Sequence, residues 1–203
     1  MRVEKRFVNR SVLVAAIAAL ILAGPAWAAQ PKKGPLKVFL LAGQSNMEGH
    51  DELRTIDFLG EDPDNDRAAL LKKFKPDGKT LVTRDDVWVV SNGAVFDKLQ
   101  PGLGARRDSA TLGNKIGPEY AFGYFMGEAL DEQVLLIKYA VGGQSLYQNF
   151  RPPSAGLPEP LPPKTKPEDF GNQYRALIGC RTSLWVNFNR TSWPWLDSAE
   201  RFR

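Results

Sequence analysis

The sequence predicts an α/β sandwich built on a parallel β-sheet. Three short runs are almost continuously apolar, at residues 36–42, 87–90 and 134–141, and each is followed by Gly or by Ser-Asn-Gly. Strands that are buried on both faces of a parallel sheet have this composition. A helical segment separates the second run from the third, and that order of elements is typical of an α/β sandwich.

The helix expected between the second and third runs spans about residues 117–130. Pro118 suits the first helical turn, and Glu119 suits the positive end of the helix dipole. Apolar side chains occur nearly all round this segment, which predicts a well-buried helix. Gly123 and Gly127 are four residues apart and would let the helix approach a sheet closely.

Three further segments have a less regular pattern. Residues 51–83 are charged and contain a short helical pattern at 67–74, whereas residues 99–114 are Gly-rich and polar. Seven prolines occur within residues 151–167. Because proline disrupts helices and sheet ladders, this last segment is expected to be a stiff loop.

Residues 1–28 have the pattern of an export signal. A basic start precedes a short apolar run at 11–23, and Ala26-Trp27-Ala28 offers a small-x-small cleavage site before Ala29. The run is shorter than the ~20 apolar residues that a spanning helix needs, so a stable membrane anchor is not expected. The sequence therefore predicts a secreted or periplasmic protein whose mature part begins near Ala29.

The composition argues against several classes of function. Removing residues 1–28 takes away four basic residues and one acidic residue, so the net charge of +4 falls to about +1, which gives no argument for nucleic acid. The single Cys, Cys180, excludes an intramolecular disulfide. One Cys and one His make a zinc site very improbable, and we expect neither a metal nor a cofactor.

Gly43-Gln44-Ser45-Asn46-Met47 directly follows the first apolar run. A Ser that ends a buried parallel strand and opens a helix lies where such sheets place their active sites. The free N–H groups of the helix would stabilise negative charge beside Ser45. The competing interpretation is a capping box formed by Ser45 and Glu48, which spacing alone favours. Met47 excludes the Gly-x-Ser-x-Gly elbow of lipases.

Three blocks along the chain resemble those of the sialate O-acetylesterase and carbohydrate esterase family six group, within the SGNH hydrolase superfamily. They are Leu41–Gly49, Gly117-Pro118-Glu119 with the aromatic helix that follows, and Lys138–Leu146. The resemblance runs from about residue 36 to 178. It implies a flavodoxin-like, three-layer α/β/α sandwich with a parallel sheet. It also implies hydrolysis of O-acetyl esters on carbohydrates, of the sialic acid or acetylxylan type, without a cofactor.

The resemblance assigns roles to individual residues. Ser45 is the nucleophile, and its own N–H together with that of Gly143 or Gly142 forms part of the oxyanion hole. Gly117 is a further candidate for the oxyanion hole. Without the resemblance, a plain strand-ending turn is the favoured interpretation of Gly142-Gly143, and Gly117 is equally the residue that begins a helix before Pro118. Four polar neighbours are candidate substrate contacts: Gln44, Asn46, His50 and Gln144.

The general base of this family is not found in the sequence. An Asp-x-x-His motif near the C-terminus supplies base and orienting carboxylate, and a Gln-Gly-Glu-like segment adds an oxyanion donor. Neither occurs in the 203 residues, and His50 is the only His. A helix continuing from Ser45 would turn by ~500° and rise ~7.5 Å over five residues, which points His50 away from the hydroxyl. We therefore expect His50 at the mouth of the cleft.

The last part of the chain has a different character. Residues 179–203 form an atypical tail, whose last nineteen residues hold three of the five Trp and show no helical or strand period. The interpretation is a partial esterase domain at residues 29–178, truncated or frameshifted near Ile178; the alternative is a native tail. Three functions follow as hypotheses: a carbohydrate O-acetylesterase, a non-catalytic carbohydrate-binding remnant, or a fragment without function.

Overall fold

The computed structural model describes residues 35–61, 65–96, 98–105 and 111–188. The expected signal peptide at residues 1–28 lies outside this part, as do residues 189–203 of the expected tail, so cleavage and export stay predictions. Within the described part, no helix combines the length and the apolar content that crossing a membrane would require.

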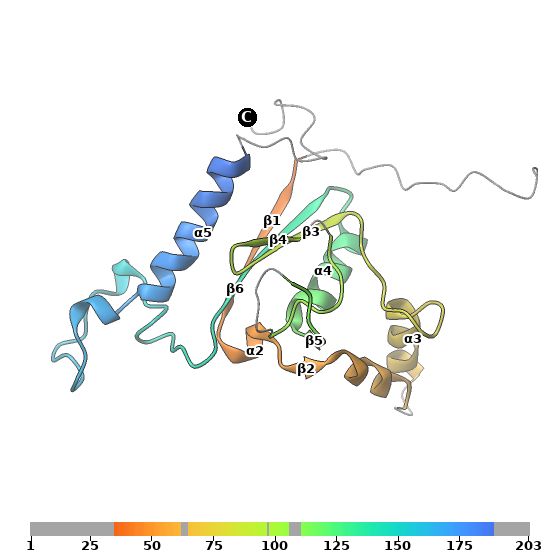
Figure 1. The fold of residues 1–203 in the computed structure, drawn as a ribbon, viewed down its shortest axis with the longest axis horizontal. Helices are drawn as coiled ribbons and strands as arrows, with labels where there is room; N and C mark the ends of the chain where they lie inside the picture. Colours follow the sequence, from red (N-terminus) through yellow and green to blue (C-terminus); the bar gives the residue numbers. More distant parts are fainter. Residues whose placement is uncertain (1–34, 62–64, 97, 106–110, 189–203) are drawn as a thin grey trace, which may run out of the picture. The chain divides into compact units, whose positions relative to one another are not determined.

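Three parallel strands form the centre of the main sheet (Figure 1). They are β1 (Lys37–Gly43), β6 (Val134–Ala140) and β3 (Val87–Ser91), and β6 lies between the other two. In the parallel register, Gly43 of β1 is paired with Ala140 of β6. The three apolar runs are thus confirmed as neighbouring parallel strands.

A fourth strand makes the sheet mixed. Strand β4 (Ala94–Phe96) pairs antiparallel with β3. Asn92 and Gly93 join the two strands, with φ angles of 48° and 85°. Asn-Gly is the residue pair that a two-residue hairpin with positive φ favours. The sequence predicted only the end of a strand at this point, and the hairpin adds an antiparallel edge strand to the expected parallel sheet.

Helix α4 (Pro118–Ala129) packs on one face of the sheet, against β6 and β3. A Cβ atom added to Gly123 would lie 2.7 Å from side-chain atoms of Leu136 and Leu99, and one added to Gly127 would lie 2.7 Å from Val87. The two glycines therefore bring the helix against the sheet, as the sequence predicted. Between helix and sheet lies the main hydrophobic core.

The opposite face of the sheet meets helix α5 (Asn172–Phe188). Side chains alternate along a strand, so Tyr139 lies on this face, and its hydroxyl donates to Gln173 Oε1 at 2.7 Å. Helices on both faces fit the expected α/β/α arrangement. The buried cluster on this face is small, consisting of Val90, Leu135 and Ile137.

Shorter elements complete the described fold. Helix α2 (Ser45–Glu48) follows β1, and η1 (Leu53–Gly60) packs against α3 (Asn65–Phe74). A second sheet consists of the antiparallel pair β2 (Asp51–Glu52) and β5 (Lys115–Ile116). The Pro-rich loop contains two short 3-10 turns, η2 (Pro153–Ala155) and η3 (Pro167–Asp169).

Helix α5 continues beyond the point where the sequence changes character. Its backbone remains helical for ten residues after Ile178, as far as Phe188. The change in sequence character near Ile178 is therefore not accompanied by the end of the helix. Residues 179–188 carry no clear apolar stripe, and periodicity alone therefore could not identify them as helical.

Candidate active site

Ser45 lies at the carboxyl end of β1, where a tight turn leads into α2. A Cβ atom on Gly43 would lie 2.7 Å from Met47 Cβ, so this turn has no room for a side chain at that position. Because β1 and β6 are parallel neighbours, the chain that follows β6 lies beside Ser45. A Cβ atom on Gly142 would be 4.0 Å from Ser45 Cβ. The structure thus brings the first and third sequence blocks together.

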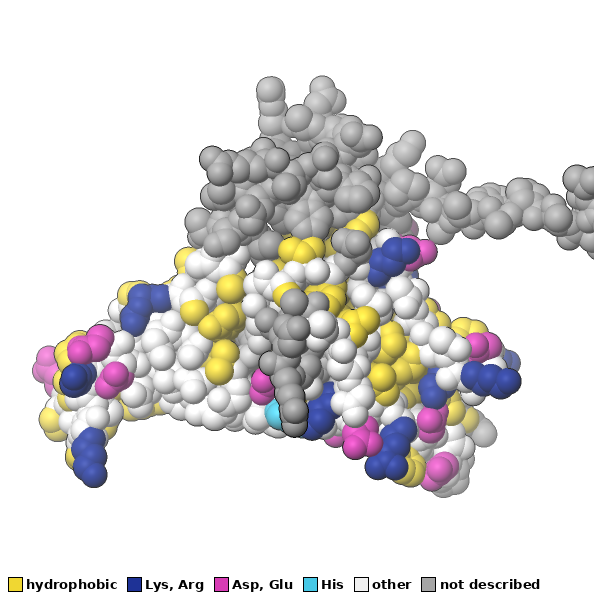
Figure 2. All heavy atoms as spheres, viewed as in Figure 1, with side chains coloured by type: hydrophobic (Ala, Val, Ile, Leu, Met, Phe, Trp, Pro, Cys, Tyr) yellow, Lys and Arg dark blue, Asp and Glu magenta, His cyan; other side chains and the backbone are white. Residues whose placement is uncertain are grey.

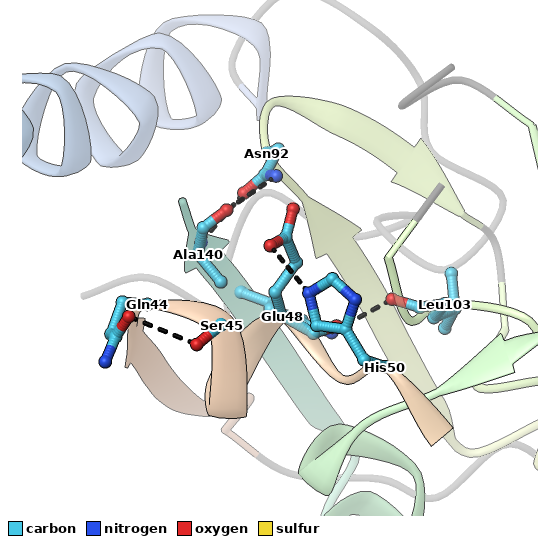
Figure 3. A network of polar contacts seen from close by, with 8 residues as sticks. Gln44, Ser45, Glu48, His50, Asn92, Leu103 and Ala140 are labelled. Carbon is cyan, nitrogen blue, oxygen red and sulfur yellow. Dashed lines mark hydrogen bonds and ion pairs between the residues drawn. The ribbon is translucent and has the colours of Figure 1, made fainter. Parts of the chain in front are cut away.

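The capping box that competes with a catalytic role for Ser45 is not formed. The N-cap of α2 is Gln44, and no side chain caps the helix. Ser45 Oγ instead donates to Gln44 Oε1 at 3.1 Å, and Glu48 Oε2 lies 3.2 Å from His50 Nε2 (Figure 3). The partly buried hydroxyl therefore has no capping role and lies next to the turn at Gly142.

The backbone between Ser45 and His50 forms a short helix followed by a turn at Gly49, and not one continuous helix. Helix α2 ends at Glu48, and Gly49 has a φ of 82°, so the helical projection used for His50 does not apply. The exposed His50 side chain points to Glu48, whereas Ser45 points to Gln44 (Figure 3). Within the described part of the chain, no hydrogen bond joins Ser45 and His50.

Gly142 and Gly143 lie immediately after the last ladder bond of β6, in which Val141 N donates to Gly43 O at 3.1 Å. Gly143 has a φ of 72°, a conformation that favours glycine, and a Cβ atom on it would meet nothing within 4 Å. A Cβ atom on Gly142 would lie 2.9 Å from Glu48 Oε2. Neither N–H donates a hydrogen bond within the described residues, so both donors are available to an oxyanion.

Gly117 is held differently from these two glycines. Its N–H donates to Glu119 Oε1 at 3.1 Å. A Cβ atom on Gly117 would lie 2.4 Å from Glu119 Oε2 and 3.1 Å from Gly49 Cα. The donor of Gly117 is thus already used in this structure, and close packing against Gly49 accounts for the absence of a side chain.

A buried ion pair supports the segment that carries Ser45, residues 44–50, which is called the Ser45 loop below. Lys138 on β6 is 2% exposed, and its Nζ lies 2.7 Å from Oε2 of the fully buried Glu119. The same Nζ donates to the backbone carbonyls of Glu48 and Leu103, each at 2.9 Å. Lys138 thus joins α2, α4 and the 99–105 loop. The sequence signal for this network was a single Lys inside an apolar run.

Asn92 fixes the end of β6. Its Nδ2 donates to the carbonyl of Ala140 at 3.0 Å, and its Oδ1 accepts from the N–H of Ala140 at 2.9 Å. Through these two bonds the Asn92 side chain pairs with both backbone polar groups of Ala140, two residues before Gly142. A cavity of about 30 Å³ beside Asn92, lined also by Glu48 and Lys138, has room for about one water molecule. Sequence reasoning identified Asn92 only as a turn residue.

An open cleft of about 650 Å³ runs past Ser45. It brings together four of the residues singled out in the sequence: Ser45, Asn46, His50 and Gly117. The other four lie outside its lining: Gln44, Gly142, Gly143 and Gln144. Gln144 accepts a hydrogen bond from Gln173 of α5 at 3.3 Å. Among the residues that the structure describes, no three acidic, His or Cys side chains are grouped as metal ligands.

Comparison with known proteins identifies the family of this arrangement. A family model described as carbohydrate esterase, sialic acid-specific acetylesterase, matches residues 35–178, which include all three sequence blocks. Searches of curated proteins and of solved structures found no match. The family match confirms the resemblance and the α/β fold class. Because it covers more than half of the 203 residues, the chain belongs to the sialic acid-specific acetylesterase family of carbohydrate esterases.

Proposed function

We propose that this chain is built to remove O-acetyl groups from carbohydrates, with Ser45 as the nucleophile. The observation that carries the proposal is the position of Ser45 at the end of β1, beside Gly142 and Gly143, whose N–H groups make no hydrogen bond in the described structure. Family membership supports an acetylated carbohydrate as the substrate. The cleft that contains Ser45 is also lined by Asn46 and His50, which supports the proposal that they contact the sugar.

The proposed reaction has two steps. Ser45 Oγ attacks the acetyl carbonyl carbon, and the oxyanion that forms accepts hydrogen bonds from the N–H groups of Gly142 or Gly143 and of Ser45 itself. The ester bond then breaks, the sugar oxygen takes a proton and leaves, and the acetyl group remains on Ser45. Water hydrolyses this acetyl-enzyme to acetate and restores the hydroxyl.

The Ser45 hydroxyl needs a general base, because a free Ser is a poor nucleophile at neutral pH. His50 is the only His in the 203 residues, and it contacts Glu48 and not Ser45. We therefore propose that these residues alone hydrolyse esters slowly. The oxyanion hole and substrate binding can still retain ~10³–10⁴-fold acceleration over water when the base is absent. The same observation favours carbohydrate binding without catalysis as the second candidate function.

The test is hydrolysis of p-nitrophenyl acetate, O-acetylated sialic acid and acetylxylan by the purified chain. Ser45→Ala should abolish the acetyl-enzyme and lower any rate above background to at most what the oxyanion hole and binding provide, and His50→Ala should change that rate little. Ser154→Ala, an exposed Ser in the Pro-rich loop, is the matched control and should behave as the parent. Adding a family C-terminal segment that carries Asp-x-x-His should raise the rate by several orders of magnitude. Full activity in Ser45→Ala would refute the proposed nucleophile, and loss of a high rate in His50→Ala would refute the argument about the base.

A further inference from the structure

A second pocket, of about 220 Å³, lies between the Pro-rich loop and the start of α5. Two arginines, Arg151 and Arg175, and two aromatic residues, Phe170 and Tyr174, line it together with three prolines. No acidic residue lines it. The volume is below the ~300 Å³ at which pockets for drug-sized ligands begin, so the space suits one small polar unit.

The guanidinium group of Arg151 is held in place by backbone carbonyls. Its Nε donates to Gly156 O at 2.7 Å, its Nη2 to Ala155 O at 2.8 Å and its Nη1 to Tyr147 O at 3.4 Å. The group also lies 5.2 Å from the centre of the Tyr147 ring. Arginine has five N–H donors, so two remain beyond these three bonds within the described structure.

Arg175, which also lines the pocket, is held by backbone carbonyls in the same way. Its Nη1 donates to the carbonyl of Phe170 at 2.8 Å, and its Nη2 donates to the carbonyl of Glu168 at 3.0 Å. No carboxylate of the described residues forms an ion pair with either arginine. Carbonyl groups supply partial charge only, so two full positive charges face one pocket without a neutralising anion.

These features favour an anionic ligand with planar oxygens. A guanidinium group matches a carboxylate in a two-bond geometry, and a group already fixed by the protein loses little freedom on binding. The prolines of the loop restrict the backbone that positions Arg151. The aromatic rings and prolines supply apolar surface that the face of a sugar ring carrying its C–H groups can contact.

The pocket is tied to the loop that leaves the proposed oxyanion glycines. The chain runs from Gly143 to Arg151 in eight residues. Gly171, on the pocket wall, donates its N–H to Gln148 O at 2.7 Å. Gln173 donates to Gln144 at 3.3 Å. The pocket wall and the segment that carries the proposed oxyanion donors are therefore joined by these two hydrogen bonds.

We propose that the pocket lined by Arg151 and Arg175 binds the carboxylate of an acidic sugar unit in the acetylated carbohydrate. The proposal rests on the proposed function for its substrate class, but it concerns binding and needs no turnover. A nonulosonic acid such as sialic acid and a hexuronic acid such as glucuronic acid both carry this group. A neutral acetylated sugar chain does not, so the pocket distinguishes between the two substrate types that the sequence left open.

The test is equilibrium binding to the full chain, measured by calorimetry or by NMR titration. N-acetylneuraminic acid and glucuronic acid are compared with their methyl esters, which keep the ring but lose the charge. At least one free acid should bind, and its methyl ester should bind at least tenfold more weakly. Which acid binds identifies the sugar. If neither acid binds, or if acid and ester bind equally, the proposal is wrong.

Variants then locate the binding site. Arg175→Gln should weaken binding of the acid at least tenfold, and Arg151→Lys should weaken it less, because the charge remains. Arg54→Gln removes an exposed arginine that pairs with Glu52 and should leave binding unchanged. Ser45→Ala should also leave it unchanged, which separates this inference from the proposed catalysis. Tight binding of the acid that persists in Arg175→Gln, in a protein with an unchanged circular dichroism spectrum, would overturn the assignment.

Discussion

The two faces of the main sheet are built in different ways. On the face under α4, strand side chains are completely buried: Val87, Val89, Val134 and Leu136 are all 0% exposed. On the other face, Val38 and Leu40 of β1 are 51% and 46% exposed. In Figure 2, exposed hydrophobic side chains gather over the middle of the view, and Lys, Arg, Asp and Glu lie mostly towards its two sides and its lower edge. The α4 face therefore has the tighter packing.

This difference in packing corresponds to two parts of the proposed site, the group that reacts and the group that binds the sugar. The Ser45 loop is supported from the α4 face, where Lys138 is buried with Glu119 and donates a hydrogen bond to the carbonyl of Glu48. The proposed carboxylate pocket adjoins α5 and uses arginines held by carbonyls near the surface. A reacting atom has to be held to a fraction of an ångström, whereas a binding group has to remain accessible.

The largest expected effect is the loss of the buried ion pair. Lys138→Met should lower the free energy of unfolding by about 3–5 kcal/mol, because Glu119 is left buried without a cation. The matched control is Lys37→Met, which removes a strand lysine paired with Glu132 at 3.1 Å, with side chains 43% and 26% exposed. That exposed pair contributes only about 0–1 kcal/mol. Urea unfolding of both variants measures the difference.

A double variant sharpens this result. Lys138→Met combined with Glu119→Gln removes the uncompensated charge and should recover part of the lost stability. It should not restore the position of α2, because the bond from Lys138 Nζ to Glu48 O is still missing. Equal losses in Lys138→Met and Lys37→Met would mean that the buried Lys138–Glu119 pair contributes no more to stability than the exposed pair of Lys37 with Glu132.

An intermediate loss of stability is expected when the close backbone packing at the Ser45 loop is disturbed. Gly49 and Gly78 both have positive φ, at 82° and 72°. A Cβ atom on Gly49 would lie 2.2 Å from Gly117 Cα, whereas one on Gly78 would meet nothing within 4 Å. Both Gly→Ala variants carry the conformational penalty of about 1–2 kcal/mol. Gly49→Ala should lose about 1–3 kcal/mol more, because the packed backbone has to move.

Thermal or urea unfolding of the two glycine variants provides the comparison. Gly49 directly follows α2, so measuring hydrolysis or ligand binding by the same two variants shows whether the Ser45 loop has moved. Similar stability losses in Gly49→Ala and Gly78→Ala would show that the contact between Gly49 and Gly117 relaxes without cost.

Local patterns explain what could be predicted from the sequence. The three parallel strands were predicted because each coincides with one apolar run, and α4 was predicted because Pro118 marks its start. The pairing of Lys138 with Glu119 could not be predicted, because it joins residues 19 apart through the fold. The capping box pattern at Ser45 was misleading because the hydroxyl bonds Gln44 instead.

The smallest expected effect compares one tyrosine from each face at alkaline pH. Burial raises the pKa of Tyr120 to about 12, and its hydroxyl donates to Val82 O at 2.7 Å on the α4 side. Burial also raises the pKa of Tyr139, whose hydroxyl donates to Gln173 on the α5 side. An unfolded tyrosine loses its proton near pH 10, so above about pH 10 the unfolded chain binds fewer protons than the folded chain. The free energy of unfolding should therefore be fully retained below about pH 10 and fall as pH rises towards 12, by at most about 3 kcal/mol for Tyr120. Tyr120→Phe should remove most of this dependence and Tyr139→Phe less, in urea unfolding measured across that range. If Tyr139→Phe removes the larger part, the face towards α5 is the more closed of the two, and the contrast between the faces is wrong.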